Sequence, residues 1–245
     1  MLSALHHYSS SINTWSAQHS LAMAMPKFNV KVISDNVCPW CYVGKRNLES
    51  AMKQFAASQP TEKDSQPPVF DVRWKPFFLN VKSPETSEEP IKEYLEKKYG
   101  KGAGSRMAVA LERAGKSTGI NFNNDRRVHN TIRSHRLVRL ADEQDKSGDM
   151  IEQLFHGYFE EGKNIADSDV LMEIAQKAGV ECTKEYLEGK EGQQEVINEY
   201  QKGVQTQGVS GVPYFIISRE GSAATVPLSG AQPPEAFVEA FEALL

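Results

Sequence analysis

Cysteine is scarce in this chain, and long apolar runs and an excess of basic residues are absent. Only three of the 245 residues are cysteines, too few for a framework of disulfides. No stretch approaches the roughly 18 uninterrupted apolar residues of a membrane-spanning helix. The formal net charge is −4, whereas a nucleic-acid-binding domain usually carries a basic excess. The composition therefore indicates a globular protein whose cysteines serve reactivity or metal binding rather than holding the fold together.

The N-terminal segment lacks charge altogether. Residues 1–26 contain no Lys, Arg, Asp or Glu. A secretory signal needs a basic start followed by an apolar stretch, and a mitochondrial transit peptide needs arginines. We therefore interpret residues 1–26 as a disordered tail, or as an upstream extension of a chain that starts at Met23 or Met25. We expect a cytoplasmic location, with a mitochondrial one as the alternative.

The rest of the chain shows two periodicities. Residues 27–34 alternate apolar and polar side chains, which predicts a strand, and the 3.6-residue spacing after Cys38 predicts a helix to about Ser58. Residues 69–75 predict a second strand, parallel to the first if the helix is a right-handed crossover. A β-hairpin is predicted over 214–218 and 224–228, and a final amphipathic helix over 234–245. Between the second strand and the hairpin, helices are predicted at 88–99, 105–118, 130–146, 149–160, 168–177 and 193–206. This order predicts an α/β fold, a mixed sheet interrupted by one large helical insertion.

Two of the three cysteines belong to the motif Cys38-Pro39-Trp40-Cys41, at the junction between the first predicted strand and the first predicted helix. The backbone N–H groups of a first helical turn lack intrahelical partners and carry partial positive charge, so they stabilise a thiolate. Pro39 suits the first helical position. Cys41 lies one turn further on and is expected to be more buried. Cys38 is therefore the predicted nucleophile, and Cys41 is predicted to resolve the mixed disulfide.

The cysteine pair has two alternative interpretations. A structural zinc site needs four ligands, usually with a second close pair, but Cys182 is isolated, so we expect no metal. The pair could also be two small buried hydrophobic residues, but the strand-to-helix position and Pro39 disfavour this reading.

Pro213 follows a glycine-containing turn and directly precedes a predicted strand. This position makes the Val212–Pro213 bond a candidate cis peptide, which would turn the Val212 backbone outward to pair with an extended substrate peptide. An ordinary trans proline at the start of a strand is the commoner case, since only about 5–6% of X–Pro bonds are cis.

The stretch from Asp35 to Gly44 resembles the active-site signature of the DsbA-like thioredoxin superfamily, specifically its FrnE-like branch. Further matching stretches are Asn130-Thr131, His135–Leu137, Leu154-Phe155, Tyr158-Phe159, Glu161–Ile165, Gly211–Phe215 and Ser229–Pro233. The resemblance implies a thioredoxin-like fold with a large all-helical insertion after the second strand. The domain boundaries expected from it are 27–82 with 205–245 for the thioredoxin-like part and 83–204 for the insertion. It also implies that Pro213 is cis and faces Cys38.

The resemblance implies a thiol–disulfide oxidoreductase that acts through the redox-active Cys38–Cys41 disulfide, with no tightly bound cofactor. The expected partner is a protein disulfide or dithiol, or a small thiol such as glutathione, and no nucleic acid or membrane. The same superfamily includes kappa-class glutathione transferases and 2-hydroxychromene-2-carboxylate isomerases, so a glutathione-dependent transferase or isomerase is one alternative. A chaperone-like binding protein is another. The protein is expected to be a monomer or a homodimer.

Several other residues are candidates with an ordinary structural alternative. Asp35 could accept a proton during exchange or cap a turn. Trp40 could stack on substrate or pack against the insertion. Asn130 is expected to be buried on the face of a helix that the resemblance places over the active site. Asn130 and His135 on this helix could contact substrate or be satisfied structural side chains.

Two features of the insertion remain. Cys182 is expected to be a buried thiol, with glutathionylation as the alternative. The cluster of Arg126, Arg127, Arg133, Arg136 and Arg139 could attract acidic groups, but we interpret it as a solvated face.

Overall fold

The computed structural model describes residues 26–59, 67–84 and 89–245. The expected disordered tail therefore lies almost entirely outside the described residues. The strands are β1 (Lys27–Ser34), β2 (Val69–Pro76), β3 (Tyr214–Arg219) and β4 (Thr225–Ser229). The α-helices are α1 (Pro39–Ser58), α2 (Ile91–Tyr99), α3 (Ala103–Thr118), α4 (Ile132–Asp142), α5 (Ser147–Phe155), α6 (Ser168–Lys177), α7 (Lys184–Glu188), α8 (Gln193–Gln207) and α9 (Pro234–Glu242). A π-helix, η1 (His156–Glu160), continues directly from α5.

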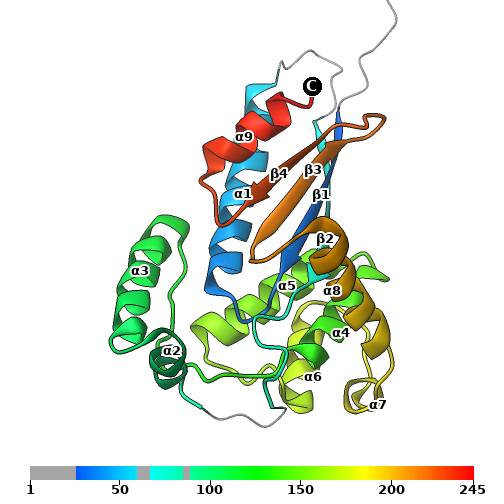
Figure 1. The fold of residues 1–245 in the computed structure, drawn as a ribbon. Coiled ribbons are helices and arrows are strands. Elements are labelled where there is room, and N and C mark those ends of the chain that lie inside the picture. The colour runs from blue at the N-terminus through cyan, green and yellow to red at the C-terminus, as the bar shows by residue number, and fades with distance from the viewer. Residues whose placement is uncertain (1–25, 60–66, 85–88) are drawn as a thin grey trace, which may run out of the picture.

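The four strands form one mixed sheet in the order β2-β1-β3-β4. β1 pairs parallel with β2 and antiparallel with β3, and β3 and β4 form the expected hairpin. In Figure 1, α1 and α9 lie together against the sheet, while α4 to α8 gather beyond β2. The predicted α/β class, the parallel crossover and the helical insertion between β2 and β3 are confirmed.

Several helices of the insertion begin or end at other residues than the predicted ranges. Helix α4 begins only at Ile132, because the Asn130 side-chain oxygen accepts a hydrogen bond from the Ile132 N–H at 2.9 Å. It ends at Asp142, and Asp145 has a φ of 55°. The predicted helix over 149–160 changes into the π-helix η1 after Phe155. Helix α7 has five residues, too few for periodicity to reveal.

One buried core runs through both the sheet layer and the insertion. On the sheet, the rings of Phe28, Phe55 and Phe241 join β1, α1 and α9, with centroids 5.0 to 5.4 Å apart. At the other end of α1, the Tyr42 ring lies 5.1 Å from Phe155 of α5. Both groups belong to the same cluster of buried residues. The active-site helix is thus packed at one end by the sheet layer and at the other by the insertion.

A group of charged side chains reinforces this second contact. The nearly buried Lys45 bonds to Glu49 and, at 2.6 Å, to Glu152 of α5. Arg46 also pairs with Glu152, at 2.5 Å, and donates a hydrogen bond to the Tyr42 hydroxyl at 2.9 Å. Because removing one member would strand a partly buried charge, this group fixes α1 against α5.

A glycine allows α1 to approach the loop that precedes β3. A Cβ atom placed on Gly44 would lie 3.0 Å from Pro213 Cγ and 3.0 Å from Phe215 Cζ. Phe215 is wholly buried and cannot easily move aside. Gly44 therefore sets the distance between the active-site helix and Pro213.

Gly44→Ala should destabilise the protein, because overpacking a buried contact typically costs about 1–3 kcal/mol. The matched control is Gly148→Ala in α5, where an added Cβ meets nothing within 4 Å. The control should be neutral or stabilising, since alanine favours helix over glycine. Urea unfolding measures both, and equal free energies of unfolding for the two variants would contradict the tight contact.

Candidate active site

The two cysteines of the motif lie at the start of α1. Cys38 is the N-cap residue, and its N–H donates to the Asp35 carbonyl at 3.0 Å, which closes the turn out of β1. Pro39 takes the first helical position. Both thiols are free. The Cys38 residue is 4% exposed and the Cys41 residue 0%, so the expected order of burial is confirmed.

The loop before β3 brings a backbone carbonyl to Cys38. The Val212–Pro213 peptide bond is cis, as the resemblance implied. The Cys38 thiol donates to the Val212 carbonyl, with 3.6 Å between Sγ and oxygen. The Pro213 carbonyl in turn accepts from Gly230 N–H at 2.8 Å, which ties the loop to the end of β4. Two segments far apart in sequence therefore meet at the first cysteine.

The surroundings of Cys41 oppose its ionisation. Burial raises the pKa of the Cys41 thiol well above its ordinary value, and the hydrogen bond and charge of Cys38 act in the same direction. The Ser34 hydroxyl and the Asp35 backbone lower this pKa, but not enough to offset the burial. Cys41 thus holds its proton more tightly than an exposed thiol does.

The Asp35 side chain is turned away from this sulfur. One carboxylate oxygen, Oδ2, accepts the Leu79 N–H at 2.8 Å, and the other, Oδ1, lies 3.5 Å from His135 Nε2. The carboxylate therefore joins the active-site turn to the loop after β2 and to α4. Its action as a proton acceptor stays a prediction.

His135 and Asn36 form the rest of this junction. The buried His135 ring has Nε2 3.1 Å from the Phe77 carbonyl and Nδ1 3.5 Å from Asn36 Nδ2. The Asn36 amide donates to Ser134 Oγ at 2.9 Å. Sequence reasoning singled out His135 but missed Asn36 and Ser134. Asn36 lies within the Asp35–Gly44 stretch, whereas nothing in the sequence marks Ser134.

Trp40 and Val212 are half-buried beside the cysteines and pack against the main core. Asn130 is also half-buried, but the expectation that it lies on a helix face is wrong. It precedes α4, and its side-chain nitrogen donates to the Ser83 carbonyl at 2.6 Å. Contact of Trp40, Asn130 or His135 with substrate stays a prediction.

The solvated basic face expected in the insertion is wrong for two of its five arginines. Arg136 is buried and donates to the backbone carbonyls of Tyr186, Leu187, Gly189 and Glu191. Arg126 is buried against aromatic rings, with its guanidinium carbon 5.0 Å from the Phe159 ring centroid. Cys182 is half-buried rather than buried, and desolvation raises its pKa.

In the part of the chain that the structure describes, no group of three or more His, Cys, Asp or Glu side chains could hold a metal ion. Within the same residues, every helix is too short or too polar to cross a membrane.

Comparisons with known proteins fit this geometry. The chain is 29% identical over 191 residues to the uncharacterised protein YwbO of Bacillus subtilis, which covers 77% of this chain and 86% of YwbO. The crystal structure of a probable DsbA oxidoreductase from Streptomyces coelicolor superposes with a TM-score of 0.74 at 28% identity, covering 89% of each chain. The cytosolic disulfide reductase DsbM of Pseudomonas aeruginosa, solved with GSH, shares the fold with a TM-score of 0.57 at 19% identity, over 88% of this chain and 100% of DsbM.

The model of the DSBA-like thioredoxin domain matches residues 29–242, which include every strand except the first two residues of β1. The matched region contains nearly all of the four-stranded sheet, the helical insertion after β2, the Cys38–Cys41 pair and Pro213. The chain belongs to the DSBA-like thioredoxin domain family.

Proposed function

We propose that this protein is a thiol–disulfide oxidoreductase that exchanges disulfides through Cys38 and Cys41. The observation that carries the proposal is the asymmetry of the pair. The first sulfur stands at a helix start against the Val212 carbonyl, and the second is wholly buried next to it. A nucleophile must be reached by its partner, whereas a resolving thiol needs only to reach the nucleophile.

The exchange follows from these positions. The Cys38 thiolate attacks one sulfur of a substrate disulfide, and the other sulfur leaves as a thiolate. Cys41 then loses its proton and attacks Cys38 Sγ. The Cys38–Cys41 bond forms, the bond from Cys38 to substrate breaks, and two electrons have passed to the substrate. Read backwards, the same steps oxidise a substrate dithiol.

The partner we propose is an extended polypeptide segment that carries a disulfide or a dithiol. When Cys38 engages that partner, its thiol leaves the Val212 carbonyl, which then becomes free to accept a backbone N–H from the segment. The half-buried Trp40 ring next to Cys38 offers an apolar surface for the neighbouring substrate residue. We propose glutathione, a small thiol, as the second class of partner. Exchange with glutathione would return Cys38 and Cys41 to the dithiol or disulfide state that they had before they reacted with the substrate.

Cys38→Ser should abolish catalysed reduction of insulin by dithiothreitol, leaving only the uncatalysed rate. Cys41→Ser should instead accumulate a mixed disulfide on Cys38, visible as an added mass that dithiothreitol removes. Cys182→Ser is the matched control and should keep the wild-type rate, because Cys182 lies on the insertion away from the pair. Full activity in the Cys38→Ser variant would exclude this cysteine as the nucleophile.

The reduced protein should lose stability in alkaline solution because of Cys41. Above the unfolded-state pKa of about 8.5, the unfolded chain releases the Cys41 proton while the folded chain keeps it. The free energy of unfolding then falls by up to about 1.4 kcal/mol per pH unit from this group. Below that pH, the same contribution is fully present.

Urea titrations from pH 7 to about 9, below the pKa of about 10 at which tyrosine ionises, measure this slope. Both proteins should carry Cys182→Ala, since the pKa of Cys182 is also raised. The slope should be shallower when Cys41→Ala is added. Superimposable slopes would show that the folded protein does not retain the Cys41 proton.

A further inference from the structure

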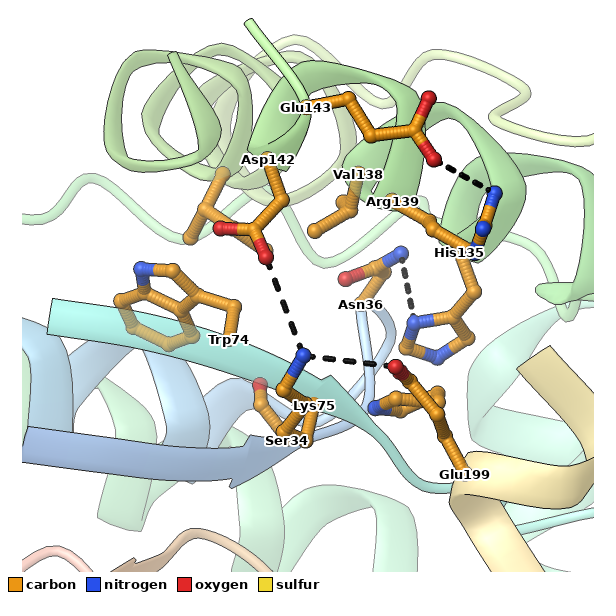
Figure 2. Close-up of a pocket in the computed structure, with 12 residues that line it drawn as sticks. Ser34, Asn36, Trp74, Lys75, His135, Val138, Arg139, Asp142, Glu143 and Glu199 are labelled. Carbon is orange, nitrogen blue, oxygen red and sulfur yellow. Dashed lines mark hydrogen bonds and ion pairs between the residues drawn. The ribbon is translucent and has the colours of Figure 1, made fainter. Parts of the chain in front are cut away.

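A polar cavity lies on the insertion side of the active-site turn. Its volume is about 160 Å³, and it is enclosed by the ends of β1 and β2, by α4 and by Glu199 of α8. Figure 2 shows Ser34 and Asn36 on the wall of this cavity, across from Asp142 and Arg139 of α4. With about 30 Å³ per molecule in the liquid, the space suits a small cluster of water molecules.

Two buried atoms on this wall have unused hydrogen-bonding capacity. Neither Ser34 Oγ nor Asn36 Oδ1 has a hydrogen-bond partner among the described residues, and the two residues are 1% and 0% exposed. Buried polar groups in folded proteins are nearly always satisfied, either by protein or by water. Internal water in the cavity would satisfy both atoms, and the remaining polar lining supplies further partners.

Ser34 is the residue that links this cavity to the resolving thiol. Its hydroxyl has no hydrogen-bond partner among the described residues, and it lies near enough to Cys41 to lower the pKa of that thiol. The Asp35 carboxylate is bonded to the Leu79 N–H and lies beside His135 instead, and the Asp35 backbone is what lowers the pKa of Cys41. Ser34 therefore offers Cys41 a side-chain proton path that Asp35 does not.

The other end of the cavity reaches the surface beside an ion-pair group. Lys75 Nζ lies 3.4 Å from Glu199 Oε1 and 3.8 Å from Asp142 Oδ2, and Figure 2 shows these three side chains meeting across the cavity. Their side chains are 21% to 35% exposed, so a proton that arrives there can pass to solvent.

We propose that Ser34 transfers the proton of the Cys41 thiol to water in this cavity, which carries it to solvent between Lys75, Asp142 and Glu199. The inference rests on the proposed function, because the step it serves is resolution of the mixed disulfide. As Cys41 attacks Cys38 Sγ, Ser34 accepts the Cys41 proton and passes its own to the water. The Cys38–Cys41 bond forms, the bond to substrate breaks, and the departing thiolate takes a proton from solvent.

The titratable groups that surround this path belong to several elements. Those at the active site are Cys38, Asp35 and His135, and those around the cavity are Lys75, Arg139, Asp142, Glu143 and Glu199. Ser34 does not itself titrate, so removing its hydroxyl changes the path without removing a charge.

Reaction with the aromatic disulfide DTNB separates the two steps in one stopped-flow record, using the full chain with Cys182→Ala. Attack by Cys38 releases one coloured thiolate, and resolution by Cys41 releases the second. Ser34→Ala should slow the second release about tenfold or more near neutral pH and leave the first unchanged. The difference in the rate of the second release between Ser34→Ala and the Ser34-containing protein should shrink as the pH rises, because Cys41 then ionises without help from Ser34. The second release in the Ser34-containing protein should also slow in D₂O.

Three further variants keep the test independent of a folding defect. Ser34→Thr retains a hydroxyl and should restore the second release to within about twofold. Val138→Met leaves Ser34 intact but fills part of the cavity with a flexible side chain, and it should slow the second release alone. Ser50→Ala, the matched control on the far part of α1, should have no effect.

An unchanged second release in both Ser34→Ala and Val138→Met would overturn the proton path while leaving the proposed exchange intact. A deficit of Ser34→Ala that is constant with pH and not restored by Ser34→Thr would overturn it as well, because it would indicate a structural role. A single thiolate released per chain before any Ser34 or Val138 change would overturn the proposed function and this inference with it.

Discussion

A thiol surrounded by protein is costly to ionise, and the site depends on this constraint at Cys41. The chain places that thiol in the first turn of α1, where it has no solvent exposure. Cys38, three residues earlier, keeps slight exposure and a carbonyl partner in Val212. The pair therefore holds two chemically different sulfurs within one helical turn. That difference separates a residue that meets the substrate from one that meets only its neighbour.

The helical insertion belongs to the site as much as the sheet does. His135 and Ser134 of α4 contact Asn36 and the Phe77 carbonyl, while Glu152 of α5 receives Lys45 and Arg46 from α1. The turn that carries Cys38 is thereby held by the insertion as well as by the Val212–Pro213 loop. A movement of α4 would reach the cysteines through the Asn36 and Asp35 side chains. The cavity beside Ser34 is also lined by Asn36 and His135. The residues that hold the Cys38 turn therefore also line the proposed proton path.

The sequence predicted the parts of the site that are local. Alternation in β1, helical spacing in α1 and Pro39 located the cysteines, the run of predicted helices indicated the insertion, and the resemblance implied the cis Pro213. The sequence could not reveal that Asn130 precedes α4 and accepts the Ile132 N–H instead of lying on the helix, since a residue pattern does not fix the first residue of a helix. Nor could it place Arg136 in the interior, because four backbone carbonyls from a distant segment satisfy it. In the sequence, Ser34 is no different from any serine at the end of a strand. Only the tertiary fold places it near Cys41 and on the wall of a cavity.

Disulfide exchange at this site requires Cys38 and Cys41 to form a reversible disulfide with each other. Equilibrating the Cys182→Ala protein in buffers of varied reduced and oxidised glutathione, followed by acid trapping and intact mass analysis, tests this directly. We expect one two-electron transition from the dithiol to an intrachain disulfide, with little glutathione adduct at the midpoint. Independent accumulation of glutathione on each cysteine, with no intrachain bond at any ratio, would contradict it.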